Sequence, residues 1–377
     1  MKVEFFRHSL GKDEKDSLLE TLDGLFLTTG PKTRQFEKEF SHYLGVNHTV
    51  GLSSCSTGLF FTLKAWGIGA GDQVIVPAMT FIATANAVLI GGAEVMFCDV
   101  DKETALIDLN MVEDLLKWNQ KVKVVLPVHL YGQMVDMKSL RELADRYHVK
   151  ILEDSAHCIE GERDGIKPGH LGDAAAFSFY ATKNVTCGEG GAVVSNDTQL
   201  TDRLRILRLH GMSKSAIDRH VKYNHWDMEV LGYKGNMYDI EAALLLPQLP
   251  KIERQWQRRE KICRQYENAF DKVGIDFPRT LPGVKSARHL FTIWAPQGKR
   301  DAFLEYLQQQ EIGVAVNYRA VHLRTYYRET FGFKPSDFPI AEEIGERTLS
   351  IPLYPRLEDR EVDYVIDKVI EAKEKLD

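Results

Sequence analysis

The chain has 377 residues, which is enough for one large domain and a smaller second one. Its hydrophobic content of 44% and charged content of 27% are ordinary for a soluble globular protein, and its net charge of −6 offers no basic surface for nucleic acid. No apolar run approaches the ~20 residues that a membrane-spanning helix needs, and the charged N-terminus lacks the apolar core of a signal peptide, so nucleic-acid-binding and membrane proteins are excluded.

The first two thirds of the chain alternate between helical and strand-like patterns. Residues 14–25 and 33–44 have the apolar spacing of helices. From residue 49 to about 240, short apolar runs alternate with helical stretches, and this order predicts an α/β domain with a mainly parallel central sheet and helices on both faces. The predicted strands include 74–76, 95–98, 122–126, 150–152 and 192–194.

The last third of the chain has a different pattern. A helical segment over 239–272 contains Pro247 and Pro250, which predict a kink or a break. The elements predicted after it are a strand at 289–295, a helix at 300–310, a strand at 313–318 and a terminal helix at 359–376. We therefore divide the chain into residues 1–250, an N-terminal segment with a large α/β domain, and 251–377, a small C-terminal α+β domain.

The five cysteines are far apart in the sequence, and none forms a Cys-x-x-Cys pair. Their odd number and their spacing argue against a zinc site and against a redox motif. We expect free thiols in the reducing cytosol, and hence a cytoplasmic protein without a metal site.

Two charged residues stand at the ends of apolar runs, where strands of a parallel sheet deliver side chains to a pocket. Asp154 follows the run 149–153, and Lys183 follows the run 174–180 and precedes a glycine-rich turn. Singly, such an aspartate is usually a turn former or helix N-cap, and such a lysine is usually solvated. Together they favour a site for pyridoxal 5′-phosphate (PLP), because the lysine can form the Schiff base and the carboxylate can keep the pyridine nitrogen protonated.

A serine-rich turn at 51–58 follows a short apolar run and precedes a helical pattern. Small residues at a helix N-terminus expose main-chain N–H groups at the positive end of the helix dipole. The turn is therefore a candidate anion site, although an ordinary N-cap turn has the same composition.

These segments, in this order, resemble a known family. It is the DegT/DnrJ/StrS type of sugar aminotransferase, whose members are PLP enzymes of aminotransferase fold type I. The matching segments are 27–33, 53–58, 71–81, 127–133, 151–157, 177–191, 232–243 and 317–327. The resemblance implies the fold type I architecture, PLP as cofactor, L-glutamate as the amino donor and a nucleotide-linked keto sugar as the acceptor.

The resemblance also implies roles around the cofactor. Lys183 would be the Schiff-base lysine that moves the proton, and Asp154 would be the partner of the ring nitrogen. The other implied cofactor contacts are Cys55, Ser56 and Ser178 at the phosphate, Phe81 on the ring face, His157 at the ring or its phenolic oxygen, and Asn236 at the phosphate of the neighbouring subunit. A site completed by the Asn236 of a second chain requires a homodimer. From the residues alone, Phe81 could equally be a core aromatic and Asn236 a turn residue.

On the substrate side, the chain most resembles the enzymes that aminate UDP-linked 4-keto sugars. The resemblance implies amination at C4, in the synthesis of cell-surface polysaccharides or of secondary-metabolite sugars. The candidate sugar and diphosphate contacts are Thr29, Arg319, His322, Tyr326 and Tyr327, each of which could instead be a surface residue. Asn317 stands where this subgroup often has histidine.

Other functions remain compatible with parts of the pattern. One is a sugar 3-aminotransferase that acts on a dTDP-linked keto sugar, and another is a non-catalytic regulator on the same fold. A PLP sugar dehydratase of this fold would have histidine in place of Lys183. An oxidoreductase that binds a dinucleotide would need Gly-x-Gly-x-x-Gly between a strand and a helix, and the sequence lacks it.

Overall fold

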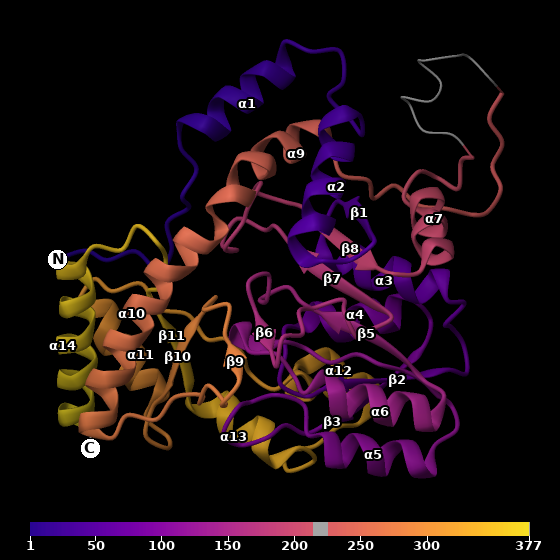
Figure 1. Cartoon of the computed structure of the whole chain (residues 1–377). Coiled ribbons are helices and arrows are strands. Elements are labelled where there is room, and N and C mark those ends of the chain that lie inside the picture. The colour runs from indigo at the N-terminus through magenta and orange to yellow at the C-terminus, as the bar shows by residue number, and fades with distance from the viewer. Residues whose placement is uncertain (214–224, 377) are drawn as a thin grey trace.

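The centre of the protein is a twisted, mainly parallel β-sheet (Figure 1). The structure is a computed structural model, and it describes residues 1–213 and 225–376. Across the seven strands that the described residues form, the order is β1 (His48–Leu52), β8 (Gly191–Ser195), β7 (Ala174–Ser178), β5 (Lys150–Asp154), β4 (Val122–Val125), β2 (Gln73–Pro77) and β3 (Glu94–Cys98). Strand β8 is antiparallel to both neighbours, and the other adjacent pairs are parallel. The prediction of a mainly parallel sheet is confirmed.

The direction of the strands brings several carboxyl ends to one edge of the sheet. Because β1 and β7 both run against β8, they run in the same direction as each other and as β5, β4 and β2. The register places Leu52 and Ser178 opposite Gly191, so β1 and β7 end where β8 begins. This is the edge at which open α/β sheets bind ligands.

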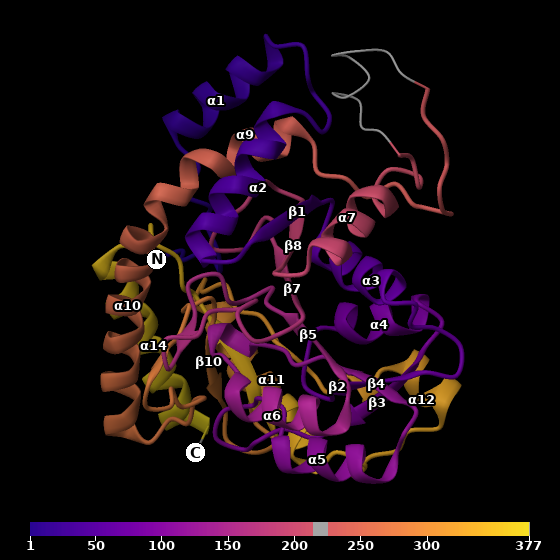
Figure 2. The ribbon, with the colours of Figure 1, turned by 45° about the vertical axis from the view of Figure 1, so that its right-hand side comes forward.

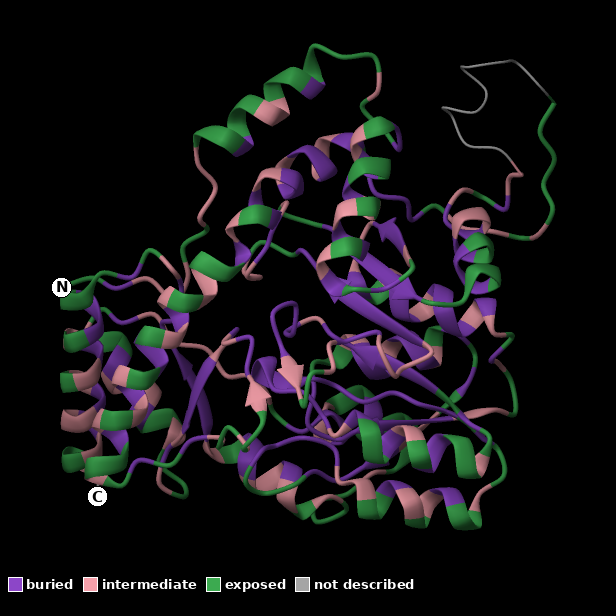
Figure 3. Ribbon diagram, in the orientation of Figure 1, coloured by how far each residue is buried: buried purple, intermediate pink, exposed green. Residues whose placement is uncertain are grey.

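Helices cover both faces of the sheet, whose strands are largely buried (Figure 3). The pleat of the strands supplies apolar side chains to each face. On β7, Ala174 and Ala176 pack with the cluster that includes α3 (Cys55–Ala65), whereas Ala175 and Phe177 pack against α2 (Pro31–Leu44). The predicted apolar face of α2 is confirmed, since Phe36, Phe40 and Leu44 are buried there. Other helices of this part of the chain are α1 (Lys12–Leu22), α4 (Ile82–Ile90), α5 (Leu109–Trp118), α6 (Met137–Tyr147), α7 (Thr198–Leu207) and α9 (Asp239–Leu245).

A second apolar core lies beside the sheet and is built mainly from the C-terminal part of the chain (Figure 2). Its elements are α10 (Ile252–Val273), β10 (Phe291–Trp294), α11 (Arg300–Gln309), β11 (Thr348–Ile351) and α14 (Asp359–Leu376). The N-terminus joins it, because Val3 is buried in this core and pairs with Ile312. The predicted break at Pro247 and Pro250 is present as a 3-10 turn between α9 and α10. The division at residue 250 stays a prediction.

The prediction was wrong for residues 313–318, which form no strand. The segment is extended, but it makes only an isolated bridge between Ala315 and Ser350. Its main chain is instead turned toward the large domain, where the Tyr131 hydroxyl donates to the Asn317 carbonyl oxygen. The sequence pattern did not predict β11, α12 (Thr325–Phe331) or α13 (Pro339–Arg347).

No helix in the described ranges has the length and apolar character needed to cross a lipid bilayer. All five cysteines are free thiols, as the spacing predicted.

Candidate active site

A cavity of about 590 Å³ opens at the edge of the sheet where the strands end. Residues from five strand ends, from the start of β8 and from two distant segments line it. They include Ser54, Cys55, Ser56, Thr80, Phe81, Val128, Leu130, Asp154, His157, Ser178, Thr182, Lys183, Glu189, Phe5, Asn317 and Tyr318. The structure thus brings together Lys183, Asp154 and the predicted cofactor contacts Cys55, Ser56, Phe81, His157 and Ser178.

Asp154 is the last residue of β5, and two hydrogen-bond donors hold its buried carboxylate. The Thr84 hydroxyl donates to Oδ2 at 2.8 Å, and the Ala156 N–H donates to Oδ1 at 3.1 Å. Burial raises the pKa of Asp154, and the Thr84 and Ala156 donors and the charge of Lys183 oppose that rise. A cationic ring nitrogen beside this carboxylate would favour its charged form.

Lys183 lies in the loop between β7 and β8, and its main-chain N–H donates to the Tyr180 carbonyl oxygen at 2.9 Å. Burial lowers the pKa of Lys183 to about 8, and the nearby Asp154 carboxylate acts in the opposite direction. A lysine with this pKa is neutral, and therefore nucleophilic, in about one tenth of molecules at pH 7. An ordinary lysine with a pKa near ~10.4 would be neutral in fewer than about one in a thousand.

This lowered pKa gives a first prediction, for the pH dependence of cofactor attachment. Only the neutral amine attacks the PLP aldehyde, so the rate of covalent attachment to the cofactor-free protein should rise about tenfold per pH unit below pH 8 and level off above it. Stopped-flow absorbance between pH 6 and 10 measures this rate. A rate that still climbs tenfold between pH 9 and 10 would show that Lys183 titrates as an ordinary lysine.

The N-terminus of α3 forms the end of the cavity next to β8. Ser54 caps the helix by accepting the Thr57 N–H at 3.0 Å, and the first turn leaves the N–H groups of Cys55 and Ser56 without intrahelical acceptors. Gly191 makes this arrangement possible, since a Cβ at that position would lie 2.2 Å from the Ser54 carbonyl carbon. Main-chain donors at the positive end of a helix suit a phosphate group.

Aromatic and imidazole rings form the sides of the cavity. Phe81 precedes α4, and 53% of its surface is exposed, so its ring face is open to a planar ligand. Its ring centroid lies 5.5 Å from that of Tyr318. His157 is buried, and its Nε2 lies 3.2 Å from the Tyr318 hydroxyl. Burial, and then the charge of Lys183, hold the pKa of His157 well below its usual range, so the ring is neutral.

A buried hydrogen bond on the other face of β5 supports Asp154. Its neighbour Glu153 points to the opposite face of β5, where Oε2 lies 2.7 Å from Nε2 of His129, and both side chains are 0% exposed. His129 Nδ1 accepts the Val135 N–H, so Nε2 carries the proton that is donated to Glu153. Glu153 Oε1 also accepts the N–H groups of Gly169 and Gly172. The main chain of His129 in turn donates to the Asp154 carbonyl oxygen at 3.0 Å.

Glu153→Gln is therefore expected to lower the free energy of unfolding by about 2 kcal/mol. The amide NH₂ group of the variant would face either the His129 Nε2–H or the N–H groups of Gly169 and Gly172, so two donors would meet without an acceptor. Denaturant unfolding measures the change. Glu94→Gln is the matched control, since the exposed Glu94 also accepts an amide, from Gln73 at 2.7 Å; it should stay within about 0.5 kcal/mol of the wild type. Equal stability of the two variants would contradict a structural role for the His129–Glu153 pair.

Asn236 and Thr29 lie outside the cavity of this chain. Asn236 is 1% exposed, and its amide donates to the Thr29 hydroxyl at 2.7 Å. Its main chain pairs with Leu52, close to the turn at Ser54, but its side chain is turned toward Thr28 and Thr29. The role of Asn236 at the phosphate of a second subunit stays a prediction.

The other substrate-side candidates lie in three different environments: a second cavity, the exposed surface and a buried aromatic cluster. Tyr326 and Tyr327 line a second cavity of about 750 Å³, which shares Thr80, Phe81, Asn317 and Tyr318 with the first. Arg319 is exposed and belongs to the lining of neither cavity in the described chain. His322 is 0% exposed and packs among aromatic side chains, 3.0 Å from Glu342. Contacts of Arg319, His322 and Thr29 with substrate stay predictions.

Several lining residues were missed by sequence reasoning. Thr84 holds the Asp154 carboxylate, yet it is an ordinary threonine in the first turn of α4. Phe5 and Tyr318 are distant in sequence from the strand ends that line the cavity, and no local pattern marks either as part of a site. Ser54 could have been found, because a serine before a helical pattern is a common N-cap.

Comparison with known proteins agrees with this geometry. Residues 8–370 match the DegT/DnrJ/EryC1/StrS aminotransferase family. The chain belongs to this family. Among relatives, the Bacillus subtilis spore coat polysaccharide biosynthesis protein SpsC is 40% identical over 96% of this chain and 94% of its own length.

Solved structures of family members share the architecture. The PMP form of Spr1654 from Streptococcus pneumoniae aligns over 100% of both chains with a TM-score of 0.94 and 30% identity, and its PLP form gives 0.93 and 29%. Helicobacter pylori PseC, an aminotransferase of pseudoaminic acid biosynthesis, gives 0.93 and 27% over 100% of both chains. The protein is thus a fold type I aminotransferase that depends on PLP, in a family of sugar aminotransferases.

Proposed function

We propose that this family member transfers an amino group from L-glutamate to the C4 keto carbon of a UDP-linked keto-deoxy sugar. The observation that carries the proposal is that Lys183 and Asp154 meet in one cavity, beside a larger cavity with which it shares four lining residues. The first is suited to the cofactor, and the second offers space for a nucleotide-linked acceptor. SpsC is named for spore coat polysaccharide synthesis, and PseC for pseudoaminic acid, so relatives serve carbohydrate synthesis.

The residues of the first cavity fit PLP. The N–H groups of Cys55 and Ser56 and the Ser178 hydroxyl would hold the phosphate, and Phe81 would cover one face of the ring. When bound, PLP supplies an electron sink that makes the proton of the donor α-carbon acidic. Asp154 would keep a proton on the pyridine nitrogen.

Lys183 has two tasks in this proposal. Its amine would hold the cofactor covalently until the amino donor displaces it. The freed amine would then take the proton from the donor α-carbon as a general base and, as a general acid, deliver it to C4′ of the cofactor. A pKa of about 8 suits both steps, because the amine can accept a proton near neutral pH and give it up again.

The second cavity would take the acceptor. Tyr326, which is largely exposed, and Tyr327, whose hydroxyl donates to Asn86 at 2.7 Å, lie along it with Arg324. Aromatic faces and a guanidinium are suitable partners for a base and a diphosphate. We place the nucleotide there and the keto carbon toward Lys183.

The acceptor is tested with the pyridoxamine form of the enzyme and a panel of UDP- and dTDP-linked 4-keto and 3-keto sugars. The proposal expects a UDP-linked 4-keto sugar to restore the absorption of the lysine-bound cofactor, and NMR of the product to show the amine at C4. An amine at C3, or a clear preference for a dTDP-linked sugar, would contradict it. No reaction with any keto sugar would favour a regulator instead.

We also propose that the working unit is at least a homodimer in which Asn236 completes the cofactor site of the other subunit. In a two-fold symmetric dimer, each subunit would supply its Asn236 to the cofactor site of the other, so the two sites would be equivalent. Asn236→Ala is expected to weaken PLP binding by one to two decades, since a hydrogen bond to a charged group is worth about 1.5–3 kcal/mol. Titration of the cofactor-free protein with PLP measures this.

A mixed dimer separates action across the interface from action within one chain. One subunit carries Lys183→Ala and the other Asn236→Ala, with two affinity tags to confirm the pairing. If Asn236 acts across the interface, both lesions fall in one site, and the other binds PLP with wild-type affinity. A confirmed mixed dimer without any wild-type site would contradict the proposal.

A further inference from the structure

Tyr131 adopts an uncommon main-chain conformation next to the cofactor cavity. Its φ of 59° and ψ of 0° lie in the left-handed region, which is unfavourable for a residue with a large side chain. It lies in the turn η1 (Leu130–Gly132), which follows β4 and its extension through Val128. Such strain persists only where the surroundings fix it, and it is concentrated at functional sites.

The surroundings of this turn do fix it. The Tyr131 carbonyl oxygen accepts the His289 N–H at 3.3 Å, and the Gly132 carbonyl oxygen accepts the Ala287 N–H at 2.8 Å. Gly132 has a φ of 104°, and a Cβ there would lie 3.0 Å from the Arg288 nitrogen. The turn is thus held against the segment from 287 to 289.

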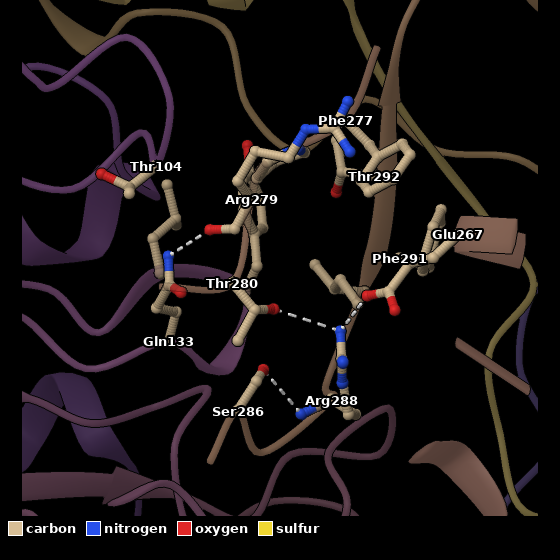
Figure 4. Close-up of a pocket in the computed structure, with 14 residues that line it drawn as sticks. Thr104, Gln133, Glu267, Phe277, Arg279, Thr280, Ser286, Arg288, Phe291 and Thr292 are labelled. Carbon is tan, nitrogen blue, oxygen red and sulfur yellow. Dashed lines mark hydrogen bonds and ion pairs between the residues drawn. The ribbon is translucent and has the colours of Figure 1, made fainter. Parts of the chain in front are cut away.

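The residue after the turn, Gln133, anchors it to the segment 279–281. A small cavity of about 40 Å³ has Tyr131 in its lining. Figure 4 shows this cavity with Gln133, whose amide donates to the Arg279 carbonyl oxygen at 3.0 Å. Gln133 Oε1 accepts the Leu281 N–H at 2.9 Å. The cavity has room for about one ordered water, so we assign it no ligand. Its polar contacts help to hold the turn in place.

The main chain of Tyr131 determines which nitrogen of His157 carries the proton. The Tyr131 N–H donates to His157 Nδ1 at 3.3 Å, so this nitrogen is bare. A neutral imidazole then has its proton on Nε2, where it is donated to the Tyr318 hydroxyl at 3.2 Å, on the cavity side. His157 therefore offers the cavity an N–H donor.

The side chain of Tyr131 fixes a second wall of the same cavity. Its buried hydroxyl donates to the Asn317 carbonyl oxygen at 2.6 Å, and Thr348 Oγ1 is a more distant donor at 3.4 Å. Asn317 and Tyr318 line both the cofactor cavity and the larger cavity beside it. One residue thus ties His157 and the Asn317–Tyr318 wall to the same turn.

We propose that Tyr131 is a positioning residue: its main-chain N–H makes His157 a donor through Nε2, and its hydroxyl sets the place of the Asn317–Tyr318 wall around the bound cofactor. Tyr131 itself would not touch PLP. The inference rests on PLP dependence and is independent of which sugar is the acceptor.

The tautomer is tested directly by ¹⁵N NMR of the holoenzyme labelled with [¹⁵N]histidine. The two ring nitrogens of a neutral histidine have distinct shifts, and His157→Gln identifies the signals by their loss. We expect a bare Nδ1 and a protonated Nε2 between pH 6 and 8. A protonated Nδ1, in either the other tautomer or the cation, would overturn the assignment.

The hydroxyl is tested with Tyr131→Phe, and Tyr266→Phe is the matched control. The Tyr266 hydroxyl is also buried and donates to a main-chain carbonyl, that of Pro352 at 2.9 Å, but it lies in the second core. We expect Tyr131→Phe to bind PLP about tenfold more weakly, the equivalent of one ordinary hydrogen bond, and to shift the absorption maximum of the bound cofactor. Tyr266→Phe should change neither property. Equal PLP affinity and equal spectra for the two variants would contradict the proposed role of the hydroxyl. The NMR measurement tests the role of the Tyr131 N–H separately, even if Tyr131→Phe folds poorly.

Discussion

Lys183→Ala is expected to prevent covalent attachment of PLP and to lower turnover by roughly four orders of magnitude or more, because the variant loses both the covalent link and the proton-transferring amine. The cavity remains, so non-covalent binding of PLP should persist, with the absorption of the free aldehyde. Absorbance spectroscopy and single-turnover assays with L-glutamate measure the two effects.

Lys150→Ala is a control for this variant. Lys150 begins β5 and is exposed, whereas the cavity lies where that strand ends. It should keep the wild-type spectrum and activity. Wild-type turnover by Lys183→Ala would exclude Lys183 as the attachment site.

Asp154→Asn is expected to keep PLP bound but to lower kcat by roughly 10²–10⁴-fold. The amide has nearly the same shape as the carboxylate, and the Thr84 hydroxyl can donate to its oxygen or accept from its nitrogen. It lacks the charge that holds a proton on the ring nitrogen, and this charge acts mainly in the transition state. The PLP dissociation constant and kcat, measured separately, distinguish the two effects.

The neighbouring residue provides the comparison. Glu153→Gln changes the same strand by the same chemistry, but on the other face of β5, so it should lower stability with little change in kcat. Near-normal kcat in Asp154→Asn with cofactor bound would contradict the role of Asp154 at the ring nitrogen.

The sequence could predict the centre of the site because Asp154 ends β5 and Lys183 lies in the loop that follows β7, the neighbouring parallel strand. Asp154 and Lys183 each follow an apolar run, and the carboxyl ends of parallel strands meet at one edge. The alternating apolar runs also predicted the class of fold. These are local signals, and each depends on a few adjacent residues.

The rest of the site depends on contacts between distant segments. Tyr131 and Asn317 are 186 residues apart, and their hydrogen bond turns 313–318 away from the strand that its apolar pattern predicts. His322 was a substrate candidate by resemblance, yet the structure buries it among aromatic rings that no local pattern reveals. The side chain of Asn236 faces Thr29 in this chain, and its proposed role at the cofactor of a second subunit stays a prediction.

The central claim is that Lys183 holds PLP in this cavity and that an amino group passes there from an amino donor to a keto sugar. Borohydride reduction of the holoenzyme, followed by peptide mass spectrometry, tests it most directly. We predict a pyridoxyl group on Lys183, its absence when the enzyme is first incubated with L-glutamate, and its return after a UDP-linked 4-keto sugar is added. A pyridoxyl group on another lysine, or one on Lys183 that persists after L-glutamate, would contradict the account.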